Sequence, residues 1–262
     1  MTMATVTSIV PKENIEYYVD NVIEVEFVDG RLSKKKDKDA GNSHCQKAGV
    51  SCEVYAFTSE EEIKAMIDVF NKHIEESDGT QRQLACRNKM LFLIGLNVGL
   101  RASDIRSLKW NFFLNDDGSF KDFYSLQPKK QRKYGKFVKL YFNQTVKKAI
   151  TDYLNEYPVD DMNDYLFKSR KGDDAISENA LWRIIKTTAA EAGIDKNIGS
   201  HSLRKSFGYH VWHNAEDKNK ALVTLQLIFN HSDTRTTMRY IGLLNNEIED
   251  MFYSIDLGLD YL

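Results

Sequence analysis

Apolar residues recur at helical spacing along most of the chain after residue 57. Ile63, Met66, Ile67 and Phe70 lie three or four positions apart and predict an amphipathic helix. We expect Thr58-Ser-Glu-Glu61 to begin that helix as a capping box. Further helices are predicted over residues 82–98 (buried, ending at Gly99), after Ser103, over 143–157 (capped by Asn143), 177–192 (capped by Ser177) and 220–229.

One region departs from the helical pattern. Residues 122–127 and 137–142 alternate between polar and apolar positions or run apolar, and the basic residues 128–136 separate them. This arrangement is typical of a β-hairpin with a polar turn. The sequence therefore predicts a mainly α-helical α+β fold with one small β-hairpin or sheet, extending over about residues 57–243.

The two ends of the chain have a different composition. Residues 14–27 carry enough apolar side chains for a helix or a strand, and residues 29–43 are charged and contain glycines, which favours a linker or mobile loop. We therefore divide the chain into a lead-in and charged linker (1–56), a folded domain (57–243) and a tail (244–262). The tail is acidic with apolar positions that could pack on this domain or on a neighbouring copy: Ile248, Met251, Phe252, Ile255 and Leu257.

Composition sets limits on the class of protein. With 262 residues and 42% hydrophobic residues, the chain can bury a sizeable core. It contains no apolar run long enough to span a membrane and no secretory-signal pattern, so we expect a cytoplasmic protein. Cys45, Cys52 and Cys86 are expected to be reduced thiols. His44-Cys45 with Cys52 would be half of a metal site, but no second pair follows.

Charge is unevenly distributed. The net charge of −2 argues against the usual basic DNA-binding protein. Acidic residues gather in 59–78 and after 245, whereas basic residues gather in 129–139. A positive patch on one face therefore remains compatible with the near-neutral total. The lysines within 34–38 are interpreted as part of a solvated linker rather than a DNA-binding arm.

Chemistry concentrates in residues 199–243. His201, Arg204, His231 and Tyr240 lie at spacings that one domain could bring together. A tyrosine hydroxyl is a weak nucleophile at neutral pH because only about one molecule in a thousand is ionised. An arginine and imidazoles around a phosphate would supply a clamp on the charged oxygens and a route for the proton.

Three short motifs resemble the tyrosine recombinase (phage integrase) family. They are G-L-R-x-S-D-I at 99–105, H-x-L-R at 201–204 and N-H-S-x-x-x-T-T-x-x-Y at 230–240, where His231 precedes Tyr240 by nine residues. The resemblance implies that Tyr240 is the nucleophile and that Arg101 and Arg204 clamp the scissile phosphate. It also implies that His201 manages the tyrosine proton and that His231 donates a hydrogen bond to a phosphate oxygen.

The family places a lysine in its hairpin turn, where it protonates the leaving 5′ oxygen. We favour Lys130 for this role over Lys129 and Lys133. Lys205 stands where the family commonly has histidine, and Asn230 stands where it commonly has glycine in a left-handed turn that asparagine also tolerates. Trp182 is expected in the core rather than as a base-stacking platform. DNA-phosphate contacts are predicted for Lys129, Arg132, Lys133, Arg183 and Lys186.

The resemblance implies a site-specific recombinase or integrase that cleaves and rejoins double-stranded DNA through a 3′-phosphotyrosyl intermediate, with no cofactor and no metal. It implies a tetramer on DNA, a monomer in free solution, no membrane partner and a bacterial, nucleoid-associated setting. Residues 1–56 are expected not to form the full core-binding domain that such recombinases carry. Two alternatives remain: a catalytically silent DNA-binding remnant of the same fold, and a type IB topoisomerase-like resolving enzyme.

Overall fold

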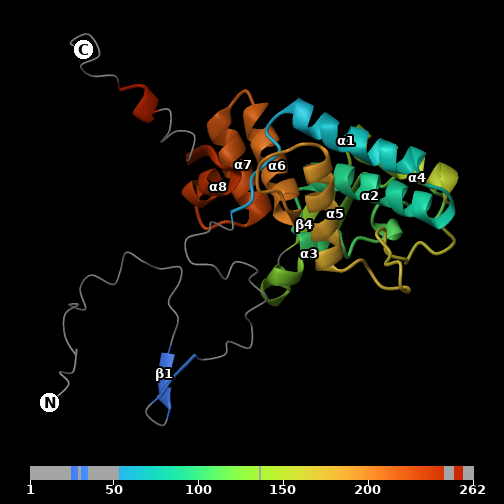
Figure 1. Cartoon of the computed structure of the whole chain (residues 1–262), viewed down its shortest axis with the longest axis horizontal. Helices are drawn as coiled ribbons and strands as arrows, with labels where there is room; N and C mark the ends of the chain where they lie inside the picture. The colour runs from blue at the N-terminus through green and yellow to red at the C-terminus, as the bar shows by residue number, and fades with distance from the viewer. Residues whose placement is uncertain (1–24, 29–30, 35–52, 136, 245–250, 256–262) are drawn as a thin grey trace. The chain divides into compact units, whose positions relative to one another are not determined.

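The computed structural model describes residues 25–28, 31–34, 53–135, 137–244 and 251–255, and the chain divides into two compact units, 1–52 and 53–262 (Figure 1). In the first unit, β1 (Val25–Val28) pairs with β2 (Arg31–Lys34) in an antiparallel hairpin. We had expected a linker or mobile loop over residues 29–43. Residues 31–34 instead form a strand. The remaining expectations for the first 52 residues, including those for Cys45 and Cys52, lie outside the described residues.

The helix α2 (Gly79–Val98) lies at the centre of the second unit and packs against α1 (Glu60–Glu75), α4 (Gln144–Glu156) and α6 (Ser200–His213). Figure 1 shows α1, α2 and α4 running beside one another. The largest side chains of this core have less than 2% of their surface exposed, and they include Phe57, Phe70, Phe92 and Ile150. The helical spacing of apolar residues predicted the three helices α1, α2 and α4.

The helix ends show which local signals were decisive. Asn143 caps α4 and Ser177 caps α5 (Glu178–Glu191), as predicted. The capping-box prediction for α1 was wrong by one residue, because the hydroxyl of Ser59, and not of Thr58, accepts the hydrogen bond from the Glu62 amide. Three other helices start earlier than predicted: α2 at Gly79, α3 (Ala102–Ile105) at Ala102 with Arg101 as its N-cap, and α7 (Lys218–Phe229) at Lys218.

The predicted hairpin is confirmed. The strands β3 (Phe123–Leu126) and β4 (Val138–Tyr141) pair antiparallel, with Phe123 opposite Tyr141. Leu126 and Leu140 face the core. The turn contains a 3₁₀ helix, η3 (Lys129–Tyr134), which alternation could not predict. A second 3₁₀ helix, η2 (Trp110–Phe112), follows α3.

The last three helices form a smaller core of their own. In Figure 1, α6, α7 (Lys218–Phe229) and α8 (Thr234–Ile241) lie close together. Buried side chains of α7 and α8 form one apolar cluster with Leu243. Gly208 permits the close approach of α6, because a Cβ there would lie 2.6 Å from Ile241 Cγ2. Asn230 adopts the predicted left-handed conformation, with φ 52°.

Of the predicted tail, the structure describes residues 244 and 251–255. The side chains of Met251, Phe252 and Ile255 are exposed there, and so is that of Tyr253. The other apolar positions of the predicted tail, Ile248 and Leu257, lie outside the described residues. Within the described ranges, none of the helices is long and apolar enough to cross a membrane.

Candidate active site

Arg204 lies at the junction of the two cores. It is on the first turns of α6 and is only 4% exposed. Its Nη1 donates to the carbonyl of Gly99, and its Nη2 donates to the carbonyl of Phe229 at 3.2 Å. These carbonyls belong to the C-terminal ends of α2 and α7, where helices carry partial negative charge. Burial lowers the pKa of Arg204 to about 10, so the guanidinium stays charged at neutral pH.

Arg101 converges on the same acceptor. Its Nη2 donates to the Phe229 carbonyl at 3.4 Å, so the two guanidinium groups meet at one backbone oxygen. Neither arginine forms an ion pair with a carboxylate among the residues that the structure describes. Asp104 is buried nearby and raises the pKa of Arg204, opposing the effect of burial. The arrangement leaves two positive charges available for an anion.

Tyr240 lies on the last turn of α8 beside these arginines. Its ring meets the rings of His231 and Phe229 edge to face, at centroid distances of 5.2 Å and 5.4 Å. Burial raises the pKa of the phenol, while the charges of Arg204 and Arg101 act in the opposite direction. The hydroxyl is therefore protonated at neutral pH and requires a proton acceptor before it can attack.

His231 is held by a neighbour on α8. Its Nδ1 lies 3.0 Å from the hydroxyl of Thr237, which is itself fully buried. Burial, followed by the charges of Arg204 and Arg101, lowers the pKa of His231 below 6.5. The imidazole is therefore neutral at pH 7.

His201 is the second residue of α6, and its side chain is exposed. Partial desolvation of the ring lowers its pKa most, and the charges of Arg204 and Lys130 lower it further. Lys130 thus lies within electrostatic reach of His201, from the exposed η3 turn. The hairpin turn is tied to the site because Asp104 accepts a hydrogen bond from the amide of Lys129 at 2.9 Å.

The structure thus brings together residues that the motifs singled out, from the N-cap of α3, from α6, from the turn between α7 and α8, and from α8 itself: Arg101, His201, Arg204, His231 and Tyr240. Lys130 of the hairpin turn adjoins them. Their catalytic roles stay predictions. The predicted phosphate contacts are more scattered. Lys129, Arg132 and Arg183 are exposed, and the side chain of Lys133 lies outside the described residues. Lys186 donates to the side-chain oxygen of Asn197 at 3.2 Å.

The core assignment of Trp182 was wrong. Its side chain is 44% exposed, because Leu181 and Ile185 occupy the buried face of α5 and leave position 182 on the outer face. The sequence did not indicate three contacts of the site: the Phe229 carbonyl with the arginines, Thr237 with His231, and Lys205 with the ring of Tyr240. Only Thr237 had a signal, because it belongs to the N-H-S-x-x-x-T-T-x-x-Y motif.

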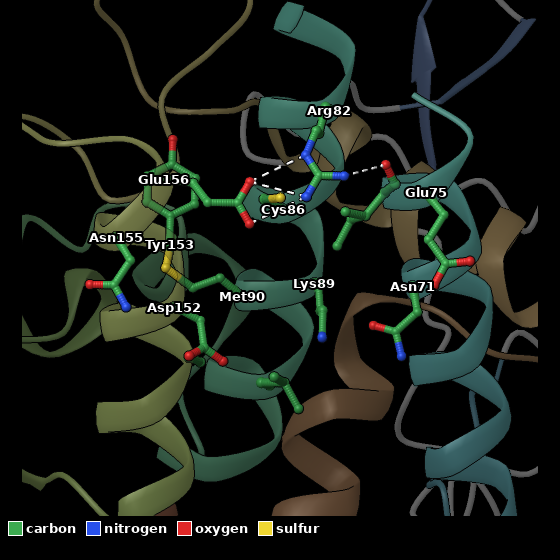
Figure 2. A pocket seen from close by; sticks show the side chains of 13 residues that line it. Asn71, Glu75, Arg82, Cys86, Lys89, Met90, Asp152, Tyr153, Asn155 and Glu156 are labelled. Carbon is green, nitrogen blue, oxygen red and sulfur yellow. Dashed lines mark hydrogen bonds and ion pairs between the residues drawn. The ribbon is translucent and has the colours of Figure 1, made fainter. Parts of the chain in front are cut away.

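A separate pocket lies between α1, α2 and α4, with a volume of about 450 Å³ (Figure 2). Arg82 reaches across it to Glu156, with nitrogen–oxygen distances of 3.2 and 3.3 Å, and also donates to the carbonyl of Ile74. None of the site residues predicted from sequence lines this pocket. Among the described residues, His, Cys, Asp and Glu side chains nowhere gather in threes as metal ligands would.

The sequence was compared with known families and curated proteins. The model of the phage integrase family matches residues 56–247. The probable integrase/recombinase YoeC of Bacillus subtilis is 33% identical over 175 residues, which cover 66% of this chain and 88% of YoeC. Tyrosine recombinase XerD of Oceanobacillus iheyensis is 27% identical over 172 residues. That match covers 66% of this chain but 55% of XerD, so the chain spans about half the length of this relative.

Solved structures show the same fold. The crystal structure of XerA recombinase superposes with a TM-score of 0.55 at 22% identity and covers 80% of this chain and 65% of XerA. XerH site-specific recombinase, bound to palindromic difH substrate in a post-cleavage complex, also gives a TM-score of 0.55 at 22% identity. It covers 74% of this chain and 51% of XerH.

Proposed function

Since the chain belongs to the phage integrase family of tyrosine recombinases, we propose that it cuts and rejoins DNA at specific sites through a 3′-phosphotyrosyl bond to Tyr240. The observation that carries the proposal is the convergence of Arg101 and Arg204 on one carbonyl, beside Tyr240 and without a carboxylate ion pair among the described residues. A buried and a half-buried guanidinium arranged in this way suit a phosphate group, whose oxygens bind arginine in a two-pronged manner.

In the proposed reaction the hydroxyl oxygen of Tyr240 attacks phosphorus and the bond to the 5′ oxygen breaks. His201 is neutral at pH 7 because its pKa is lowered, so it can accept the phenol proton. Lys130 gives a proton to the departing 5′ oxygen. The new phosphodiester keeps the energy of the broken bond, so rejoining is the same chemistry in reverse.

The charge that develops on the phosphate oxygens would be stabilised by Arg101 and Arg204. We assign His231 a supporting donor role. The hydroxyl of Thr237 lies 3.0 Å from Nδ1 and 3.4 Å from the carbonyl of Asp233. In the tautomer in which this hydroxyl donates across the shorter contact, to Nδ1, the ring proton of the neutral imidazole is on Nε2. That proton can then be donated to a nonbridging oxygen.

The DNA itself would be held mainly through its backbone. The exposed Lys129, Arg132 and Arg183 can contact phosphates, and we propose the same for Lys133 and Lys186. Exchange between two duplexes requires a cut in both strands of each, and each copy carries one Tyr240. We therefore propose a tetramer on DNA. We also propose that the free protein is a monomer and that it acts at the bacterial nucleoid.

The decisive test is a suicide-substrate assay. Nicked duplexes that tile the DNA around the gene are incubated with wild-type protein and with Tyr240→Phe, and the products are separated on denaturing gels. We expect a protein–DNA adduct with wild type that Tyr240→Phe abolishes. If both proteins shift DNA on native gels and neither is trapped, the chain binds DNA without cleaving it and the proposal fails.

The same assay identifies the hairpin acid. A substrate with sulfur in place of the bridging 5′ oxygen has a leaving group that departs without a proton. We expect Lys130→Ala to cleave the ordinary substrate about 10²–10⁴-fold more slowly and the sulfur substrate at nearly the wild-type rate. Lys129→Ala and Lys133→Ala are the matched controls. Rescue of either one instead of Lys130→Ala would move the acid to that lysine.

A further inference from the structure

The segment that leads into α1 is fastened to the helix that carries Arg204. The amide of Phe57 donates to the hydroxyl of Ser206 at 2.7 Å, in a buried hydrogen bond. The carbonyl of Glu53 accepts from the side-chain amide of Asn197 at 2.7 Å. Residues 53–57 therefore lie in a defined position against the loop that precedes α6 and against the middle of that helix.

Lys205 links this segment to Tyr240. The side chain of Lys205 is 10% exposed, and its Nζ lies 2.8 Å from Oε1 of Glu53. The same ammonium lies 5.7 Å from the centre of the Tyr240 ring, within the range of a cation–π interaction. A buried ammonium is costly unless it is paired, and Glu53 supplies the opposite charge. The Lys205 ammonium thus contacts both the Glu53 carboxylate and the Tyr240 ring, which are distant from each other in the sequence.

The other contacts of Tyr240 come from the apolar cluster of α7 and α8, from two aromatic neighbours and, at the phenol, from Arg204. Phe229 and His231 both meet the ring edge to face. Edge contacts of this kind are individually weak. A cation over the ring adds an attraction that depends on the position of the ring. Lys205 is therefore suited to fix the ring beside the arginines.

We propose that Lys205 is a positioning residue that holds the ring of Tyr240 for attack, and that Glu53 keeps the Lys205 ammonium over that ring. The inference rests on the proposed function, in which Tyr240 is the nucleophile. It adds that the first residue of the second unit helps to set how the nucleophile is presented. The role of Lys205 acts through Tyr240 and requires no contact with DNA.

The test compares three substitutions in the full chain. Lys205→Met keeps much of the length and removes the charge, Lys205→Arg keeps a cation, and Glu53→Gln removes the partner charge. Single-turnover trapping on a nicked duplex is measured at saturating protein. We expect Lys205→Met to lower the rate about 5- to 30-fold, Lys205→Arg to restore most of it, and Glu53→Gln to lower it less. DNA affinity on native gels should stay at the wild-type value.

Lys196→Met is the matched control. Lys196 pairs with Glu62 at 2.6 Å, and both side chains are about a quarter exposed. Within the described part of the chain, neither side chain stacks on or pairs with Tyr240. We expect this variant to be trapped at the wild-type rate. An equal slowing in Lys196→Met and Lys205→Met, or a Lys205→Arg variant as slow as Lys205→Met, would reduce Lys205 to a folding role and overturn the proposal.

A spectroscopic measurement separates this inference from the proposed function. 3-Fluorotyrosine is incorporated only at position 240, and its ¹⁹F resonance is recorded without DNA. We expect the resonance to move and broaden in Lys205→Met and to stay near the wild-type position in Lys205→Arg and Lys196→Met. If all four proteins give the same resonance, the positioning role is refuted whether or not the chain cleaves DNA. If the resonance behaves as expected but no adduct forms, the proposed function fails alone.

Discussion

Arg82 and Arg204 are both held by hydrogen bonds, yet their surroundings are opposite. Arg82 faces the pocket of Figure 2, where the Glu156 carboxylate takes two of its hydrogen bonds and raises its pKa. Arg204 is bound by two backbone carbonyls, and burial lowers its pKa. The first charge is neutralised within the protein. The second has no carboxylate ion-pair partner among the described residues and can bind an anionic ligand, which is why we propose the Arg204 region as the functional one.

The largest effect should separate these two regions. Arg204→Lys and Arg101→Lys are expected to slow adduct formation about 10²–10³-fold, because an ammonium cannot reproduce the forked donors of a guanidinium. Arg82→Lys is the control and should be trapped at the wild-type rate. Single-turnover trapping measures all three. If Arg82→Lys slowed the reaction as much as Arg204→Lys, the contrast between the two sites would be without functional meaning.

A smaller effect concerns the pH dependence of the reaction. His201 has a folded-state pKa below 6.5, so the basic form is present at pH 7 and is lost as the pH falls through that lowered value. We expect the trapping rate to be flat near neutrality and to fall about tenfold per pH unit below the pKa.

Lys130 offers a way to sharpen that measurement. Its charge helps to lower the pKa of His201, after the larger effects of desolvation and Arg204. The sulfur substrate needs no acid, so it allows Lys130→Ala to be assayed. Removal of the lysine charge should raise the pKa of His201, so the trapping rate of Lys130→Ala should begin to fall at a higher pH than that of wild type. If the rate falls at the same pH in both proteins, another group accepts the phenol proton.

The smallest effect is expected in the pocket. Arg82→Met removes an ion pair that is partly open to solvent, and such pairs contribute little to stability. We expect the melting temperature to change by only about a few degrees and DNA cleavage to be unaffected. Thermal melting with and without salt tests this. A large loss of stability would mean that the Arg82–Glu156 pair is needed to hold α2 against α4.

Local signals predicted much of the helical framework. Caps such as Asn143 and Ser177 could be identified because each acts on an amide only three residues away. The position of the N-cap of α1 was ambiguous, because Thr58 and Ser59 are both good caps and acidic residues follow both. The outward position of Trp182 depends on which face of α5 the core takes, and a short apolar run does not specify that.

The site was predicted in part for a different reason. Spacing identified His231 and Tyr240 as candidates, but their surroundings come from long-range packing. Lys205 and Glu53 are 152 positions apart, and nothing local to either residue indicates the pair. The carbonyl of Phe229 is equally hidden, since every residue has a carbonyl and only tertiary structure determines which one faces an arginine.

The use of main-chain oxygens to hold Arg204 has a consequence for how such chains diverge. A carbonyl persists through every substitution, so neither acceptor can be lost by a change of side chain alone. What can be lost is the course of the backbone: Gly99 has φ +60°, and a Cβ there would lie 2.5 Å from the ring of Phe207, while Phe229 is fully buried. Selection at these two helix ends therefore acts on amino-acid identity through the path of the chain and not through the chemistry of the acceptor.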